Sequence, residues 1–323
     1  MGLNYPNLLR YGILKIMTCD VENFEHDPRL AETLVTYPQG DLDSTSRCVG
    51  VVRLRPENDA EMTGVITETT AIHPVSSTWP DQPADKGRMR LDSKDFELAG
   101  AIETTIARSG SELGLFPRVP KRRVDAEEAF EVVLHLIKGS VPVEIGMQIE
   151  FSADSDFREN LSRGHSICHL QAIALNQTLA DYWKKAVDRI DSLGHPDFDQ
   201  IAITSSKIHE NSSVDVYRVG RSLRKKGFNA ERLINDHEEI RGACEAQLRA
   251  WIASGYEIEV SGDGGRLGDR RNWSCKMESV TLSMPCGGTH IPNTLEIGDA
   301  QIEWALSPEN DFLTVTTKAV NNS

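Results

Sequence analysis

The sequence lacks any long apolar run. None of its 323 residues lies in a stretch approaching the roughly 18 uninterrupted apolar residues that a membrane helix needs. Its start also lacks the basic residues and apolar core of a signal peptide. A glycine-rich phosphate-binding loop is missing, as is any sign of an ATP-binding core. These absences predict a cytoplasmic protein with no membrane-spanning segment and no ATP chemistry of that kind.

Cysteine is scarce and scattered. The six cysteines form no dense framework of the kind that holds small secreted domains together. They are Cys19, Cys48, Cys168, Cys244, Cys275 and Cys286. In a reducing compartment such residues are buried thiols or metal ligands rather than disulfides.

Negative charge outweighs positive charge. Taken alone, the formal net charge of −14 argues against a partner as acidic as nucleic acid. Binding depends on where charges lie, however, and the basic residues gather in three places. Each place is either a solvated face or a contact for phosphate groups. They are Lys121-Arg122-Arg123; the group Arg218, Arg221, Arg224, Lys225 and Lys226; and the group Arg266, Arg270 and Arg271.

The chain is longer than a typical compact domain, so two domains sharing an interface are expected. We expect residues 1–152 to form a β-rich, barrel-like domain. Short segments rich in Val, Ile and Thr, separated by Gly, Pro and Asp, indicate strands there. Residues Ser93 to Ser109 also fit a helix. The expected strands are Tyr11–Met17, Arg47–Leu54, Gly64–Ile72, Phe96–Ile102, Phe130–Ile137 and Val143–Phe151.

Residues 153–323 change to an α+β pattern, with helices on one face of an antiparallel sheet. Apolar residues at helical spacing predict a helix from Phe157 to about Leu193. A short basic helix is expected from Val214 to Lys226, ended by Gly227, and a long one from Asn229 through Ser254. The expected strands are Tyr256–Val260, Ser279–Met284, Ala300–Ala305 and Leu313–Lys318.

Two short motifs carry the chemistry. His165 and His169 are four positions apart in the expected helix, so both imidazoles share one face and can hold one ion. Cys286 and His290 flank Gly-Gly-Thr after an expected strand, and the glycines permit a tight turn that directs both side chains to a common point. Three imidazoles and a thiolate suit Zn²⁺. Either pair alone is weak evidence, because a helix histidine is usually a core or surface residue; the combination is far more specific.

The combined pattern resembles the editing domain of alanyl-tRNA synthetases and of free-standing alanyl-tRNA editing proteins, and more distantly that of threonyl-tRNA synthetases. That family carries HxxxH on a helix and then CxGTH leading into a glycine-bearing segment. Here the pattern reads His165 to His169, then Cys286 to His290, followed by Ile-Pro-Asn-Thr-Leu-Glu-Ile-Gly298, and the likeness covers roughly residues 142 to 305. The resemblance implies that His165, His169, Cys286 and His290 bind zinc.

A fainter likeness lies in the first half. The family's T-x-F-Y-P and Q-P-x-D-x-G segments correspond to Thr70-Ala-Ile-His-Pro74 and Gln82-Pro-Ala-Asp-Lys-Gly87. The family's glycine run between them is replaced by Val-Ser-Ser-Thr-Trp-Pro-Asp, which leaves the amino-acid specificity open. The resemblance implies that Thr70 lies near the bound amino acid and that Gln82 either hydrogen-bonds substrate or supports the loop. The alternative is an ordinary proline-rich loop.

The resemblance implies a zinc-dependent hydrolase that cleaves the ester of a mischarged aminoacyl-tRNA, such as Ser-tRNA(Ala) or Gly-tRNA(Ala), and that acts in trans. Bound zinc either lowers the pKa of a water to about 7 or orients the substrate. Four protein ligands fill a tetrahedral shell, as in a structural site, so the sequence identifies neither the role of the metal nor a catalytic base. Phosphate contacts need positive charge. The candidates for the tRNA backbone are therefore Arg218, Arg221, Arg224, Lys225 and Lys226.

Two alternatives stay open. The first keeps the zinc without catalysis, as a zinc-stabilised RNA- or protein-binding module, and the acidic net charge favours a protein partner within it. The second keeps hydrolysis but changes the substrate, to a tRNA carrying an unusual amino acid or to a small ester or amide. The altered loop between Thr70 and Gly87 motivates the second. Neither DNA nor a membrane is an expected partner.

Overall fold

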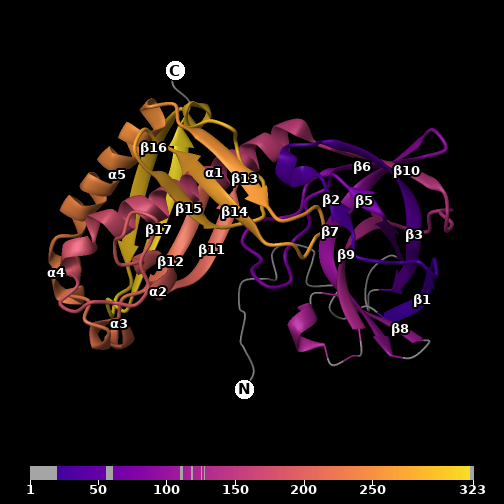
Figure 1. Cartoon of the computed structure of the whole chain (residues 1–323), viewed down its shortest axis with the longest axis horizontal. Helices are drawn as coiled ribbons and strands as arrows, with labels where there is room; N and C mark the ends of the chain where they lie inside the picture. Colours follow the sequence, from indigo (N-terminus) through magenta and orange to yellow (C-terminus); the bar gives the residue numbers. More distant parts are fainter. Residues whose placement is uncertain are drawn as a thin grey trace. The chain divides into compact units, whose positions relative to one another are not determined.

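The computed structural model describes residues 20–55, 61–109, 112–117, 119–124, 126 and 128–320. Contacts within the chain define two compact units (Figure 1). Unit 1 comprises Met1–Ser155 and Gly264–Asp269, and unit 2 comprises Asp156–Asp263 and Arg270–Ser323. Within the described ranges, no helix has the length and apolarity that crossing a membrane requires.

Unit 1 is built from strands. Its main sheet has eight strands in the order β1-β3-β10-β6-β7-β9-β4, with β8 on β7 and an additional β3–β4 pairing; β2 and β5 form a short parallel pair. The remaining pairings are antiparallel. The described residues establish no closed barrel. The strands are β1 (Asp20–His26), β2 (Leu34–Val35), β3 (Asp43–Arg55), β4 (Met62–Thr67), β5 (Thr69–Thr70), β6 (Gly87–Leu91), β7 (Lys94–Ser109), β8 (Glu112–Pro117), β9 (Glu128–Lys138) and β10 (Gln148–Ala153).

The central strand β3 separates two hydrophobic clusters. Cys48 and Val51 belong to one cluster, whereas Val49 and Val52 belong to the other. Side chains of a regular strand alternate between its two faces, so Cys48 and Val51, three positions apart, would normally point to opposite faces. A register shift between Cys48 and Gly50, of the kind that a β-bulge produces, brings them to the same face. The continuous apolar run therefore faces core on both sides.

Several expected strands of unit 1 are confirmed, with different ends. Ser93 to Ser109 is strand rather than helix, because β7 pairs along its length with β6, β8 and β9. The segment Val143–Phe151 becomes extended only at Gln148, after turns at residues 145–146. The expected strand Tyr11–Met17 lies outside the described residues.

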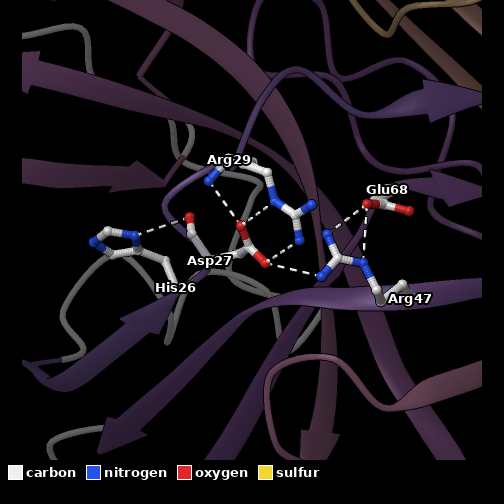
Figure 2. Close-up of polar contacts among 5 residues, drawn as sticks. All are labelled: His26, Asp27, Arg29, Arg47 and Glu68. Atoms are coloured by element: carbon white, nitrogen blue, oxygen red, sulfur yellow. Dashed lines mark hydrogen bonds and ion pairs between the residues drawn. The ribbon is translucent and has the colours of Figure 1, made fainter.

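A network of ion pairs ties together the segment after β1, the strand β3 and the segment before β5 (Figure 2). The Asp27 carboxylate accepts hydrogen bonds from the Arg29 backbone N–H and guanidinium and from Arg47 Nη1, the last at 2.8 Å. Arg47 also donates to Glu68 through Nε and Nη2. These donors, Arg29 first, hold the pKa of Asp27 well below its usual range. Asp27 is thus ionised at neutral pH, and the network is a structural feature of unit 1.

Unit 2 combines helices with two antiparallel sheets, of order β11-β12-β17-β16 and β13-β14-β15. The α+β class is therefore confirmed. The strands are β11 (Ile203–His209), β12 (Ser212–Arg218), β13 (Glu257–Gly262), β14 (Arg271–Lys276), β15 (Thr281–Pro285), β16 (Asp299–Leu306) and β17 (Phe312–Val320). The helices are α1 (Ser155–Thr178), α2 (Phe198–Ala202), α3 (Arg221–Lys225), α4 (Ala230–Asn235) and α5 (His237–Ala253).

Three expected helices of unit 2 differ from the structure. The first ends at Thr178 as α1, and most of the chain from there to Leu193 is irregular. The expected helix Val214–Lys226 is half strand, since β12 lies between β11 and β17, and only α3 is helical. Asn229 does cap a helix, accepting a hydrogen bond from the Arg232 N–H, but Asp236 divides that helix into α4 and α5.

Two hydrophobic clusters lie in the described part of unit 2, and the larger one brings together its helices and sheets. Ile167 and Leu170 of α1 pack in it together with Tyr217 of β12 and Leu248 of α5. The helix α5 lies along β16 (Figure 1), and its Arg249 donates to the Ala300 carbonyl. The helix α1 is buried through most of its middle turns, which fixes the side chains that it carries.

Candidate metal centre

The helix α1 carries the first two candidate ligands. His165 and His169 are one turn apart on a helix that is buried through this region, and their rings lie 4.6 Å apart between centroids. Gly164 allows the neighbouring turn of the β11–β12 hairpin to approach closely. A Cβ at this position would lie 2.3 Å from the His209 carbonyl oxygen. This close contact between α1 and the hairpin fixes the position of His165 relative to β11 and β12.

The other two ligands follow β15. Cys286 begins the turn, its N–H donating to the Arg271 carbonyl, and the Gly288 N–H points to the Cys286 sulfur at 3.4 Å. Neither Gly287 nor Gly288 has a positive φ, and a Cβ on Gly287 would meet only ordinary contacts. The turn therefore brings Cys286 and His290 together without the left-handed conformation that glycine adopts most readily. An N–H donated to sulfur stabilises the thiolate form that binds metals.

The four side chains meet at one point. One ligand atom from each of His165, His169, Cys286 and His290 lies within 4.8 Å of the other three. The Cys286 sulfur is 3.5 Å from His165 Nε2 and 3.4 Å from His290 Nε2. Tetrahedral zinc with bonds of about 2.0–2.1 Å to nitrogen and about 2.3 Å to sulfur places N and S roughly 3.6 Å apart. The spacing of these atoms fits such an ion.

The environment of His169 also fits a metal ligand. Its Nε2 atom is buried and has no hydrogen-bond partner in the described part of the chain. Burial, with a contribution from His165, holds the pKa of His169 well below its usual range, so the ring is neutral and offers a lone pair. A buried polar atom without a partner costs free energy, and a bound cation would remove that cost.

Further residues around the cluster carry no signal of their own in the sequence. Trp273 of β14 is fully buried, and its ring lies edge-on to His169 with 5.1 Å between centroids. Ser166, inside the HxxxH motif, lies 3.1 Å from His290 Nδ1 through its Oγ. The HxxxH motif gives no reason to single out Ser166, because its histidine partner, His290, belongs to the other motif.

The residues expected on the substrate side lie in unit 1. Thr70 is fully buried in β5, and its hydroxyl contacts His135 Nε2 at 2.9 Å and accepts the Ile72 N–H. The other ring nitrogen of His135 faces the Val65 carbonyl, so Nε2 is the acceptor and the Thr70 hydroxyl is the donor. The Thr70 hydroxyl thus donates its proton to one protein group and accepts a hydrogen bond from another.

Gln82 lies in the loop between β5 and β6. Its side chain is almost fully buried, and its N–H donates to the Asp81 carboxylate. The ends of the loop are tied together, because the His73 N–H donates to the Asp85 carboxylate and the Asp85 N–H to the His73 carbonyl. These hydrogen bonds hold the two ends of the loop together, and Gln82 lies between them.

The five basic residues proposed for the tRNA backbone lie close together and exposed. Arg218 ends β12, and the others follow on α3 and its C-terminal residue Lys226. The segment before α2 adds Lys184 and Lys185, since the Lys184 N–H donates to the Gly227 carbonyl. No carboxylate pairs with any of these seven cations in the described chain. Ion pairs with carboxylates hold seven different cations of unit 2: Arg163, Arg189, Arg232, Arg241, Arg249, Lys276 and Lys318.

Comparison with known proteins relates part of this chain to one group of enzymes. No protein-family model matches it. The chain is 23% identical over 184 residues to the alanine–tRNA ligase of Sulfurisphaera tokodaii, 29% over 172 residues to that of Lactobacillus acidophilus, and 25% over 199 residues to that of Campylobacter jejuni. These matches cover 51–61% of this chain and 17–21% of those ligases. The chain is thus homologous, at low identity and over about half its length, to a segment of alanine–tRNA ligases, and it spans about a fifth of the length of these relatives.

Proposed function

We propose that this protein is a zinc-dependent deacylase that hydrolyses the ester of mischarged aminoacyl-tRNA, with Ser-tRNA(Ala) or Gly-tRNA(Ala) as substrate, acting in trans in the cytoplasm. The observation that carries the proposal is the convergence of His165, His169, Cys286 and His290 from two distant motifs. Homology to alanine–tRNA ligases supports a tRNA-linked substrate. The proposal places the site in a zinc-binding editing domain of residues 153–323, after a β-rich domain of residues 1–152.

The chemistry of the ligand set fits this reaction. When bound there, zinc supplies Lewis acidity and orientation for an activated ester. His169 is kept neutral by burial, and the Gly288 N–H favours the thiolate of Cys286. These groups hold a cation without needing a proton to leave the imidazole of His169. The role left to the protein is to hold the ester carbonyl beside a water, and no catalytic base is assigned.

Thr70 and Gln82 are the proposed substrate-side residues. Because the Thr70 hydroxyl is already bonded to His135 and Ile72, its contribution would come from its shape rather than from a free hydroxyl. Gln82 belongs to an anchored loop that carries Trp79, an indole with 45% of its surface exposed, where the related editing domains have a glycine run. This loop is the reason to test other amino acids as well as serine and glycine.

The tRNA backbone is proposed to contact Arg218, Arg221, Arg224, Lys225 and Lys226, with Lys184 and Lys185 beside them. Their ammonium and guanidinium groups are exposed and lack carboxylate partners in the described chain, so phosphate groups would not have to displace an existing ion pair. Such contacts position RNA without reading its sequence.

The decisive experiment measures deacylation of Ser-tRNA(Ala) by the purified protein, with Ala-tRNA(Ala) alongside. We expect the seryl ester to be cleaved, the alanyl ester to be spared, and Cys286→Ala to lose both metal and activity while remaining folded. Cys244→Ala is the matched control, because Cys244 is a buried thiol of α5 outside the cluster. Loss of zinc without loss of cleavage would refute the metal-dependent mechanism.

Two further outcomes separate the alternatives. Stoichiometric zinc with both esters intact, but with cleavage of another aminoacyl-tRNA or small ester, identifies a different substrate and is favoured by the altered loop around Trp79. Stoichiometric zinc with no cleavage of any ester identifies a zinc-stabilised binding module, which four protein ligands favour.

A further inference from the structure

Ser166 connects the two halves of the candidate metal centre. It is fully buried on α1, and its hydroxyl oxygen accepts the N–H of Ile291 at 3.2 Å. The same oxygen lies 3.1 Å from Nδ1 of His290. One hydroxyl group therefore contacts both a candidate ligand and the backbone that directly follows it, across 124 positions of sequence.

The geometry assigns different tasks to the two nitrogens of His290. Nε2 is the atom that faces the Cys286 sulfur, at 3.4 Å. A neutral imidazole has one N–H and one lone pair, so a ring that presents its Nε2 lone pair to a cation carries its proton on Nδ1. That proton needs an acceptor in a buried place. The Ser166 oxygen has two lone pairs, one for the Ile291 N–H and one for Nδ1–H.

We propose that Ser166 is a positioning residue, which holds His290 in the Nδ1–H tautomer with Nε2 directed at the metal and ties the Cys286–His290 turn to α1. The inference rests on the metal site of the proposed function, and it does not depend on the identity of the ester. Groups that orient a ligating imidazole from behind alter metal affinity by about 10–100-fold.

Helix α1 provides a matched control. Ser162 lies one turn before Ser166 and is also buried, yet its side chain has no hydrogen bond to either motif in the described chain. Replacing either serine by alanine removes one oxygen atom and slightly favours the helical state. Ser166→Ala and Ser162→Ala should therefore both fold, and near-ultraviolet circular dichroism checks that they do.

The first test is the affinity of the full chain for Co²⁺, measured by chelator competition with the cobalt absorption spectrum as the second readout. We expect Ser166→Ala to bind Co²⁺ about 10–100-fold more weakly with an altered spectrum, Ser162→Ala to match the wild type, and Ser166→Thr, which keeps the hydroxyl, to regain most of the affinity. Unchanged affinity and spectrum in Ser166→Ala would overturn the inference. Wild-type protein that binds no metal would overturn it too, together with the metal site.

The second test needs no metal. The ring-nitrogen chemical shifts of His290 in ¹⁵N-labelled protein report which nitrogen carries the proton. We expect these shifts to change in Ser166→Ala and to stay unchanged in Ser162→Ala; identical shifts in all three proteins would contradict the assignment. A wild-type protein whose Co²⁺ affinity depends on Ser166, yet which cleaves no aminoacyl-tRNA, would leave this inference standing while the proposed function fails.

Discussion

At the scale of single residues, neighbouring positions in one motif have opposite roles. Cys168 lies directly before His169, but its sulfur is 3.6 Å from both carboxylate oxygens of Asp215, away from the metal cluster. Burial raises the pKa of the Cys168 thiol well above its usual value, with Asp215 adding to the effect, so it stays protonated. Cys286 is partly exposed and receives an N–H. Exposure and hydrogen bonding, rather than residue type, separate the inert thiol from the candidate ligand.

Asp215 itself gives a prediction about pH. Burial, the largest cause, raises its pKa from 3.8 to about 7. The folded protein therefore holds this proton more tightly than the unfolded chain, and the stability it contributes is complete below about pH 4 and lost as pH rises through about 7. Asp215→Asn cannot ionise, so between pH 5 and pH 8 it should lose less unfolding free energy than the wild type, by roughly 1–3 kcal/mol.

Urea unfolding of both proteins at pH 5 and pH 8 checks this prediction. The comparison isolates Asp215, because every other titrating group is common to the two proteins. An equal loss of unfolding free energy in the wild type and the variant would contradict the prediction. It would show that the pKa of Asp215 in the folded protein is not raised.

At the scale of elements, local patterns predicted the framework of the metal site better than its surroundings. The helical spacing of His165 and His169 was readable because both lie on one helix, and the strand before Cys286 was expected one or two residues from its real position. The strand β12 was missed although Val214, Val216 and Tyr217 favour strands, because its buried positions include the polar Ser213 and Asp215 and so show no apolar alternation. Ser166 and Trp273 could not be assigned, because their partners are set by tertiary packing.

Two glycines in helices give opposite predictions. Alanine at Gly164 of α1 would bring a Cβ to 2.3 Å from the His209 carbonyl oxygen and 2.8 Å from that of Ser212, both backbone atoms that cannot rotate away. Alanine at Gly242 of α5 would meet nothing within 4 Å. Overpacking costs about 1–3 kcal/mol, whereas glycine-to-alanine in an open helix gains up to about 1 kcal/mol. We expect Gly164→Ala to destabilise and Gly242→Ala to stabilise.

Chemical unfolding of the two variants tests this contrast, and metal binding adds a second readout. Because Gly164 precedes His165, displacing α1 from the β11–β12 hairpin should also weaken metal binding, whereas Gly242→Ala should leave it unchanged. A Gly164→Ala protein as stable as the wild type would show that the hairpin turn yields at little cost.

At the scale of the whole molecule, the charge total and the charge distribution give different expectations. The net charge of −14 repels a polyanion at long range. Seven cations of unit 2 form ion pairs with carboxylates, whereas the seven around α3 and Gly227 form none in the part of the chain described. At physiological salt the Debye length is about 8 Å, so an RNA phosphate at this patch responds to the nearby cations more than to the distant total.

The last prediction separates these two effects with variants of equal net charge. Arg224→Gln/Lys225→Gln removes two unpaired cations of the patch, and Lys276→Gln/Lys318→Gln removes two cations that are paired with glutamates. Each double variant lowers the formal charge from −14 to −16. If the patch contacts phosphate, the first should reduce the slope of log affinity for tRNA against log salt by roughly one to two units, since each contact contributes about 0.7–0.9. The second should leave the slope unchanged. Equal effects of the two variants would mean that only the overall charge matters, and the tRNA would have to be placed on another surface.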